Sequence, residues 1–235
     1  MKLSGVVITH NEEQGILDCL KSLQFCDEII VVDSGSTDQT VALARQMTAN
    51  VYQKEWMGYS AQKNYANSLA KGEWILSVDA DEVVPNSLAS EIRQRVQMSS
   101  PTVGFLISRR TIHFGRWIRH GGWYPNRLLR LFKKSDGHWE GSDLHEYWKT
   151  TGKIETLKED LIHHSFQNLS DQVIRNNRYS TLGPQSCAPA ESVFLFCDYP
   201  EKPSPSFWKP TFLKLVFWMV IQDSSSQSQP LTRFS

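Results

Sequence analysis

Two aspartates separated by a single residue are the sharpest chemical signal in this sequence. Asp79 and Asp81 follow directly after the apolar run 74–78 (WILSV). In an extended segment, residues i and i+2 point to the same side, so both carboxylates are expected to face one site. Two negative charges that close together require a shared proton or a cation between them. Oxygen ligands at a strand end suit magnesium or manganese, whose coordination is commonly completed by substrate phosphates.

Two further polar clusters follow predicted strands. Residues 9–12 (THNE) end the first β-rich run, and residues 33–38 (DSGSTD) follow the run 28–32 (EIIVV). Taken singly, each cluster is better explained as a helix cap or a turn, because Asn, Ser and Asp favour those positions. In a parallel α/β sheet, however, ligands bind beyond the carboxyl ends of the strands. Together with the cluster at 79–82 (DADE), they therefore predict one crevice lined by acids and hydroxyls.

The first hundred residues alternate between strand and helix patterns, which positions these clusters. Strands are predicted at 4–9, 28–32, near Val51 and at 74–78, and helices at 11–23, 41–47, 60–70 and 86–96. This alternation predicts an α/β fold with a doubly wound, mostly parallel sheet flanked by helices. No GxGxxG or GxxxxGKS loop is present, which excludes the dinucleotide fingerprint and the P-loop.

Composition narrows the classes of protein further. The chain has 235 residues with 25 basic and 25 acidic side chains, so a partner bound by bulk positive charge, such as nucleic acid, is not expected. Four cysteines without a CxxC pair, and an amino-terminal apolar stretch too short for a signal peptide, indicate a reduced, cytoplasmic protein. Residues 207–221 are apolar but interrupted by Lys and Pro, which indicates a membrane-surface segment, a core segment or a tail.

The middle stretch, 102–166, is basic and aromatic. Strands are predicted at 104–108 and 128–132, and eight basic residues stand between Arg109 and Lys134 without an acidic one. A solvated basic face explains this run as well as a site for a ligand with sugar rings and phosphates does. Both interpretations remain open at this stage.

Several motifs in order make the sequence resemble a known family. VVITHNEE, EIIVVDSGSTD, the AQKN of 61–64 and WILSVDADEVV together resemble glycosyltransferase family two, inverting enzymes with the GT-A fold. GGWYPNRLLRLF and HWEGSDLHE narrow the likeness to bacterial lipopolysaccharide core glycosyltransferases, the group related to the inner-core β-1,4-glucosyltransferase. The resemblance covers residues 2–183. It implies a nucleotide-sugar half at 1–100 and a mixed acceptor-binding half at 101–183 of one domain, followed by an atypical Pro- and Ser-rich tail at 184–235, expected to be partly disordered.

The resemblance also implies roles on the donor side. Asp33 matches the base-reading aspartate, whose carboxylate accepts the uracil N3–H and rejects cytosine. An Mn²⁺ or Mg²⁺ cofactor would neutralise the departing diphosphate. The implied nucleotide-sugar residues are Thr9, Asn11, Glu12, Asp33, Lys63 and Asp79, and the implied metal ligands are Asp79, Asp81 and His163, with His164 blurring the choice of histidine.

On the acceptor side, inversion needs a base that takes the proton of the attacking hydroxyl. Glu146 is the implied base and Asp143 the second candidate, with Asp81 as the other catalytic residue. The competing interpretation of Glu146 is an ion pair with a nearby arginine. Sugar rings stack on indole and arginine grips phosphates and carboxylates, which assigns Trp123, Arg127 and Arg130 to the acceptor. A place in the core would equally explain Trp123.

The function that these inferences imply is transfer of a hexose, with glucose as first choice, from a UDP-sugar to a lipid-linked core oligosaccharide. The enzyme would act in the cytoplasm, with peripheral contact to the inner membrane. Transfer to a polyprenyl phosphate is the alternative within the fold. A phosphatase of the haloacid dehalogenase type is another, because SVDADEVV fits its DxDxV pattern, although a downstream lysine and acidic pair are missing. A non-catalytic sugar-nucleotide-binding protein is the third.

Overall fold

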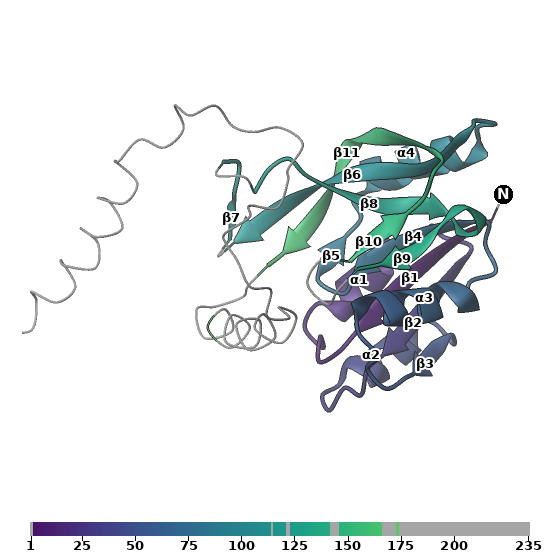
Figure 1. Cartoon of the computed structure of the whole chain (residues 1–235). Coiled ribbons are helices and arrows are strands. Elements are labelled where there is room, and N and C mark those ends of the chain that lie inside the picture. Colours follow the sequence, from purple (N-terminus) through teal and green to yellow (C-terminus); the bar gives the residue numbers. More distant parts are fainter. Residues whose placement is uncertain (1, 114, 121–122, 142–145, 166–172, 174–235) are drawn as a thin grey trace, which may run out of the picture. The chain divides into compact units, whose positions relative to one another are not determined.

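The computed structural model describes residues 2–113, 115–120, 123–141, 146–165 and 173. Figure 1 labels the helices and strands. In chain order the elements are β1 (Leu3–Thr9), α1 (Ile16–Ser22), β2 (Glu28–Asp33), α2 (Thr40–Met47), β3 (Val51–Gln53), α3 (Tyr59–Leu69), β4 (Trp74–Asp79), β5 (Glu82–Val83), α4 (Asn86–Gln97), β6 (Thr102–His113), β7 (Arg116–Trp117), β8 (Asn126–Lys133), a 3-10 turn (Lys134–Asp136), β9 (His138–Glu140), β10 (Tyr147–Lys149) and β11 (Lys153–His164).

Nine of the described strands form one sheet in the order β3-β2-β1-β4-β8-β6-β11-β5, with β7 paired to β6. Strands β3, β2, β1 and β4 are parallel, and β8 runs antiparallel between β4 and β6. The chain moves outward from β1 to β3 and then returns through α3 to β4, on the other side of β1. This reversal between β1 and β4 is the switch point at which open α/β sheets bind ligands.

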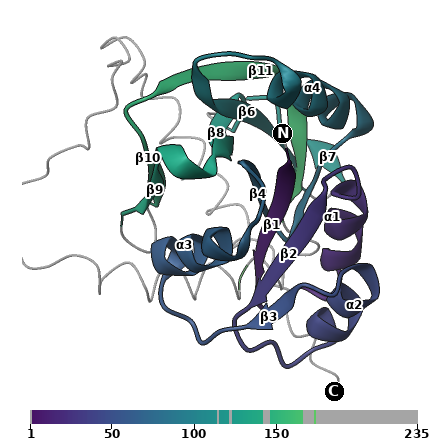
Figure 2. The same cartoon turned by 90° about the vertical axis from the view of Figure 1, so that its right-hand side faces the viewer.

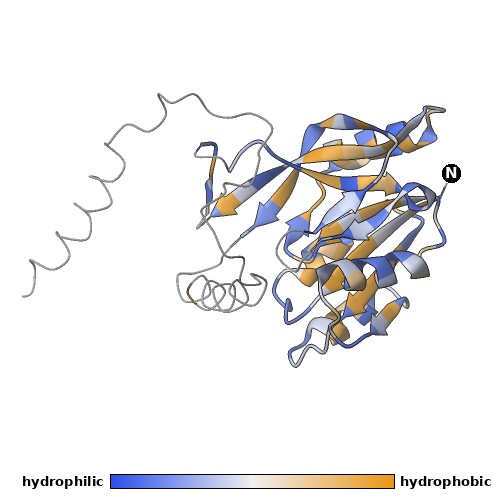
Figure 3. Ribbon diagram, viewed as in Figure 1, coloured by the Kyte–Doolittle hydropathy of each residue, from blue (hydrophilic) through white to orange (hydrophobic). Residues whose placement is uncertain are grey.

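Helices cover both faces of the sheet, as Figure 2 shows. On one face, α1, α2 and α4 bury apolar residues against the strands, among them Ile16, Leu20, Ala44, Leu88 and Ile92 on Val7, Val31 and Leu76. On the other face, α3 packs through Ala66 beside the two-stranded sheet of β9 and β10. Figure 3 shows the matching pattern, with hydrophobic residues concentrated in the strands between these layers. Burial of both sheet faces explains why the parallel strands are almost continuously apolar.

The β9–β10 sheet is fixed to the rest of the domain by two contacts. The Phe132 ring of β8 stacks on Trp148 with centroids 3.8 Å apart, and Trp139 lies edge-on to both. The Asn64 side chain of α3 then donates to the Trp139 carbonyl and accepts its N–H, each at 2.8 Å. These contacts hold the two strands that flank residues 141–146.

The structure confirms the predicted α/β fold, and the predicted strands and helices of the first hundred residues are present. One local prediction is wrong. Ala80 and Asp81 form a turn between β4 and β5, so the alternation of an extended strand does not apply to Asp79 and Asp81. The predicted tail, 184–235, and its apolar segment 207–221 lie outside the described residues, and the domain boundaries stay predictions. No helix within the described ranges is long and apolar enough to cross a bilayer.

Candidate active site

The three polar clusters lie at neighbouring strand ends. Thr9 of β1 is in register with Asp33 of β2, and Ile8 of β1 is in register with Asp79 of β4. The expectation that these clusters share one edge of the sheet is therefore confirmed. The order β2-β1-β4 places Asp33 and Asp79 on either side of β1, at the switch point.

Asp33 is fully buried and organises the turn that follows it. Its Oδ2 accepts the N–H groups of Gly35 at 3.0 Å and Ser36 at 2.9 Å, and its Oδ1 accepts the Ser36 hydroxyl. Gly35 has a φ of 85°, a conformation that glycine adopts without steric cost. A carboxylate has about four acceptor positions, so these three hydrogen bonds leave one position on Oδ1 unfilled.

The loop after β1 is tied to this turn by a second set of hydrogen bonds. Asn11 donates its N–H to the Ser36 hydroxyl and accepts the Thr37 N–H, both at 2.8 Å, and Glu12 donates its N–H to Thr40 at 2.8 Å. Asn11 holds a φ of 54°, which asparagine tolerates better than most residues. Among the described residues, the buried Thr9 hydroxyl meets no hydrogen-bond partner. A buried polar group of this kind is a place where a ligand can bond.

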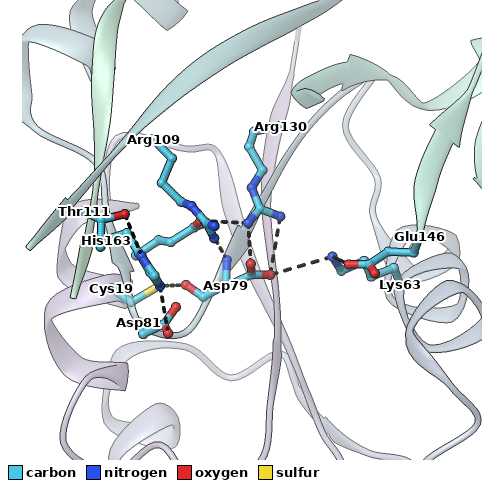
Figure 4. A network of polar contacts seen from close by, with 10 residues as sticks. Cys19, Lys63, Asp79, Asp81, Arg109, Thr111, Arg130, Glu146 and His163 are labelled. Carbon is cyan, nitrogen blue, oxygen red and sulfur yellow. Dashed lines mark hydrogen bonds and ion pairs between the residues drawn. The ribbon is translucent and has the colours of Figure 1, made fainter. Parts of the chain in front are cut away.

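Asp79 is held by two cations, as Figure 4 shows. Both terminal nitrogens of Arg130 donate to its carboxylate, and the Lys63 Nζ lies 3.7 Å from Oδ1. The Asp79 side chain remains 34% exposed, whereas Arg130 is only 4% exposed. The carboxylate is therefore fixed on its inner side and open to a ligand on its outer side.

Glu82, which ends the predicted cluster 79–82 and received no role from the sequence, is a second buried anion. Its Oε1 accepts from Arg130 at 2.7 Å and lies 3.5 Å from Arg109, and its Oε2 accepts the Asp79 N–H at 3.0 Å. Arg130 thus bridges the carboxylates of Asp79 and Glu82. Its terminal donors are taken up inside the protein, which leaves it poorly placed for the acceptor role expected from the sequence.

The two carboxylates titrate in opposite directions. Burial alone would raise the pKa of Asp79, but Arg130 and then Lys63 hold that pKa well below its ordinary value. Burial raises the pKa of Glu82, and the nearby charges of Asp79 and Asp81 add to this, while Arg130 opposes it. Asp79 is therefore the permanently ionised member of the pair.

Asp81 and His163 face one another on the side of Asp79 that lies away from Lys63 (Figure 4). The His163 Nε2 lies 3.3 Å from the Asp81 Oδ2, and the Thr111 hydroxyl lies 3.2 Å from Nδ1. The neighbouring His164 is exposed and contributes only its backbone N–H, to the Asp81 carbonyl at 3.0 Å. The geometry thus distinguishes His163 from His164.

This pair fits a divalent cation that shares its coordination with a ligand. A carboxylate oxygen and an imidazole nitrogen are ordinary donors for manganese, and the Thr111 hydroxyl lies within hydrogen-bond distance of the far ring nitrogen, where it can orient the ring. Asp79 points to Arg130 instead, so Asp79, Asp81 and His163 do not form the single cluster expected from the sequence. No group of three or more His, Cys, Asp or Glu able to hold a metal occurs in the described part of the chain.

Glu146 lies across the site from the Asp81–His163 pair. Its Oε1 accepts from the Lys63 Nζ at 2.8 Å, and Lys63 also lies over the Trp139 ring at 4.6 Å. The alternative interpretation of Glu146 was an ion pair with an arginine, and the structure shows an ion pair with a lysine instead. Lys63 thereby links Glu146 to Asp79. Asp143, the second candidate base, lies outside the described residues.

The remaining expected acceptor residues lie on the surface at the same edge. Trp123 is 43% exposed, with its ring 5.8 Å from that of His113 at the end of β6. Arg127 of β8 is exposed and in register with Ser108 of β6. Neither residue contacts the Asp79 network, so their role stays a prediction.

Comparison with known proteins identifies the family. The family model "Glycosyl transferase family 2" matches residues 4–151, and the chain therefore belongs to glycosyl transferase family 2. Its fold is the GT-A fold expected from the sequence. Among curated relatives, the lipopolysaccharide core biosynthesis glycosyltransferase LpsC of Rhizobium meliloti is 30% identical over 77% of this chain and 70% of its own length. An uncharacterized glycosyltransferase of Rickettsia felis is 34% identical, over 77% and 68%.

Solved structures of low identity also align with the chain. TarS of S. aureus in complex with UDP-GlcNAc aligns with a TM-score of 0.49 and 20% identity, over 72% of this chain and 60% of TarS. Glucosyl-3-phosphoglycerate synthase of Mycobacterium tuberculosis, in complex with Mn²⁺, UDP-glucose and phosphoglyceric acid, aligns with a TM-score of 0.41 and 24% identity, over 46% and 44%. The chain thus spans less than two thirds of either solved chain.

The Arg130 network leads to a prediction about stability. Because the pKa of Asp79 is depressed in the folded state, its ionisation stabilises the fold above the ordinary carboxyl pKa of about 4, and this contribution is lost as the pH falls further. Asp79→Asn should lower the melting temperature at pH 7, and the gap to the parent should shrink below about pH 4. Thermal melts across this range measure it. Asp18→Asn, at a carboxylate 73% exposed, should show little gap, and a gap for Asp79→Asn that is constant with pH would contradict the assignment.

Proposed function

We propose that this family member transfers a hexose, glucose in the first instance, from a UDP-sugar to a lipid-linked lipopolysaccharide inner-core oligosaccharide with inversion at the anomeric carbon. The observation that carries the proposal is the meeting of Asp79, the Asp81–His163 pair and the Lys63–Glu146 pair beside the β1–β4 switch point. The name of the relative LpsC supports a lipopolysaccharide core acceptor. Membership of family 2 removes the phosphatase interpretation.

The donor base would bind at the end of β1 and β2. The remaining acceptor position of Asp33 suits the uracil N3–H, and the unpaired Thr9 hydroxyl lies on the neighbouring strand end. Asn11 and Glu12 would border the nucleotide, because their backbone groups already fix the loop against the Asp33 turn. The rigid turn means that little order must be gained when the base binds.

Asp81 and His163 would hold the Mn²⁺ or Mg²⁺ ion, which neutralises charge on the departing diphosphate when it is bound. Asp79 would accept a hydroxyl of the ribose or of the donor sugar through its exposed side, because Arg130 and Lys63 keep it ionised. We assign Arg130 to this positioning role in place of the acceptor role. Arg109 and Glu82 complete the charge balance around it.

Glu146 would take the proton of the attacking acceptor hydroxyl. The new bond forms from the acceptor oxygen to the anomeric carbon, the bond from that carbon to the diphosphate oxygen breaks, and the proton passes to Glu146. Lys63 holds Glu146 in place at 2.8 Å and, once Glu146 is neutral, its charge is free to act on Asp79 and the leaving diphosphate. Trp123 and Arg127, exposed at the same edge, are assigned to the acceptor sugar and its anionic groups.

The first prediction of the proposed function concerns the reaction itself. With Mn²⁺, UDP-glucose should add one hexose to a truncated lipopolysaccharide, and mass spectrometry of the product measures it. UDP-galactose and UDP-N-acetylglucosamine serve as donor controls, and polyprenyl phosphate is offered beside the core acceptor. Addition to polyprenyl phosphate alone would establish the rival transferase. Binding of UDP without transfer to either acceptor would establish a non-catalytic binding protein.

The second prediction concerns the cation. Asp81→Asn and His163→Ala should each remove most of the increase in UDP affinity that Mn²⁺ provides, a loss of about tenfold or more. The reason is that each variant lacks one side chain that would coordinate the ion directly. Isothermal titration with UDP, with and without Mn²⁺, measures this without turnover. Asp136→Asn, at an exposed aspartate, is the matched control and should behave as the parent protein. An undiminished Mn²⁺ effect in both site variants would exclude these residues as ligands.

The third prediction concerns the base. Glu146→Gln should lower kcat by about 10²-fold or more while UDP affinity stays within about twofold, because general base catalysis typically contributes 10²–10⁴. Steady-state transfer and UDP titration provide the two readings. Glu140→Gln, on the neighbouring strand β9, is the control for a glutamate paired with a lysine. Transfer by Glu146→Gln at nearly the parent rate would remove Glu146 from the reaction.

A further inference from the structure

The segment around β7 exposes an unusual mixture of arginine and aromatic side chains. We call its described residues, 115–120 and 123–127, the cationic hairpin. The rings of Trp117, Trp123 and Tyr124 are 39%, 43% and 36% exposed. Four further side chains with basic groups are exposed beside them, namely Arg116, Arg119, His120 and Arg127. None of these seven residues belongs to the Asp79 network.

The charges of the cationic hairpin face solvent rather than internal acids. Among the described residues, the acid in contact with it is Asp160 of β11, which accepts from the Tyr124 hydroxyl at 3.2 Å and from the neighbouring Arg110 at 2.9 Å. Arg110 in turn lies 5.1 Å from the Trp117 ring centroid and supports that ring from β6. Within the described residues, Arg116, Arg119 and Arg127 form no ion pair. Their guanidinium groups are therefore available to anions outside the protein.

The cationic hairpin extends from the same edge of the sheet as the candidate active site. β6 runs parallel to β11 and in the direction of β4, so its last residues lie at the carboxyl edge, where Figure 1 shows β7 beyond the end of β6. Contacts along β6 lead from the site to the hairpin: Arg109 to Glu82, Thr111 to His163, and His113 to Ser165 at 3.1 Å. A surface bound at the hairpin would consequently lie next to the site.

We propose that the cationic hairpin docks the protein on an anionic phospholipid bilayer. Tryptophan and tyrosine favour the headgroup region, where the ring is in an apolar layer and the N–H or O–H stays hydrated. Arginine pairs with lipid phosphates in bidentate geometry, and basic side chains near an anionic leaflet add to binding one by one. The inference goes beyond the proposed transfer reaction. Its test uses Arg116, Trp117 and Arg119 alone, because Trp123 and Arg127 are also assigned to the acceptor in that reaction.

The test measures binding of the full chain to vesicles, without donor or acceptor. Vesicles of phosphatidylcholine alone are compared with vesicles of phosphatidylcholine and phosphatidylglycerol by co-sedimentation. Arg116→Gln with Arg119→Gln should weaken binding to the anionic vesicles by roughly tenfold, and added salt should narrow this difference. Trp117→Ala should weaken binding to both kinds of vesicle.

Matched controls lie elsewhere on the same fold. Arg45→Gln with Lys158→Gln removes two exposed charges from α2 and β11, and Trp56→Ala removes a ring that is 42% exposed. Both should bind as the parent chain does, and melting curves check that every variant is folded. All variants keep residues 207–221, so any binding through that segment is common to them.

Two outcomes would overturn the proposal. Anionic vesicles bound equally by the parent and the hairpin variants would do so, as would an equal loss in the charge-matched control. A titration with inorganic phosphate tests whether the hairpin binds a free phosphate group rather than a lipid headgroup. If the hairpin variants lose affinity for phosphate but keep vesicle binding, the surface is an anion subsite and not a membrane surface.

Discussion

The buried guanidinium of Arg130 between Asp79 and Glu82 is the interaction on which the candidate site depends. A carboxylate removed from water is costly unless it is paired, and Glu82 is completely buried. Arg130 pairs with both carboxylates, while Lys63 lies near Asp79 and Arg109 lies near Glu82. The fold can therefore keep an ionised Asp79 at the switch point, whereas loss of one member would leave the others as uncompensated charges.

The same network gives Asp79 and Asp81 different partners. Arg130 of β8 binds Asp79, whereas the turn at Ala80 and Asp81 directs the Asp81 carboxylate toward His163 on β11. The mixed part of the sheet is thus as important as the parallel part. β8, β6 and β11 supply Arg130, Arg109 and His163, while β1, β2 and β4 supply the strand ends that would receive a nucleotide.

Much of this arrangement could be predicted from local patterns. The parallel strands are buried on both faces and read as apolar runs, and each polar cluster directly follows such a run, so their common edge follows from the doubly wound topology. The pairing of Glu82 with Arg130 could not be predicted, because it requires β8 to insert antiparallel beside β4. One signal did exist: Arg130 interrupts the apolar run LLRLF, and an arginine on a buried strand requires a carboxylate partner. The orientation of Asp81 was missed because a two-residue turn replaces extended backbone there.

The hydrogen bonds of Asn64 to both backbone groups of Trp139 have an evolutionary consequence. They join α3, which carries Lys63, to the strand before residues 141–146, and the stack of Trp148 on Phe132 secures the strand after them. Both ends of that stretch are anchored by residues outside it. Asn64 is accordingly expected to vary little in evolution, because its loss would displace both Lys63 and the strand pair that leads to Glu146.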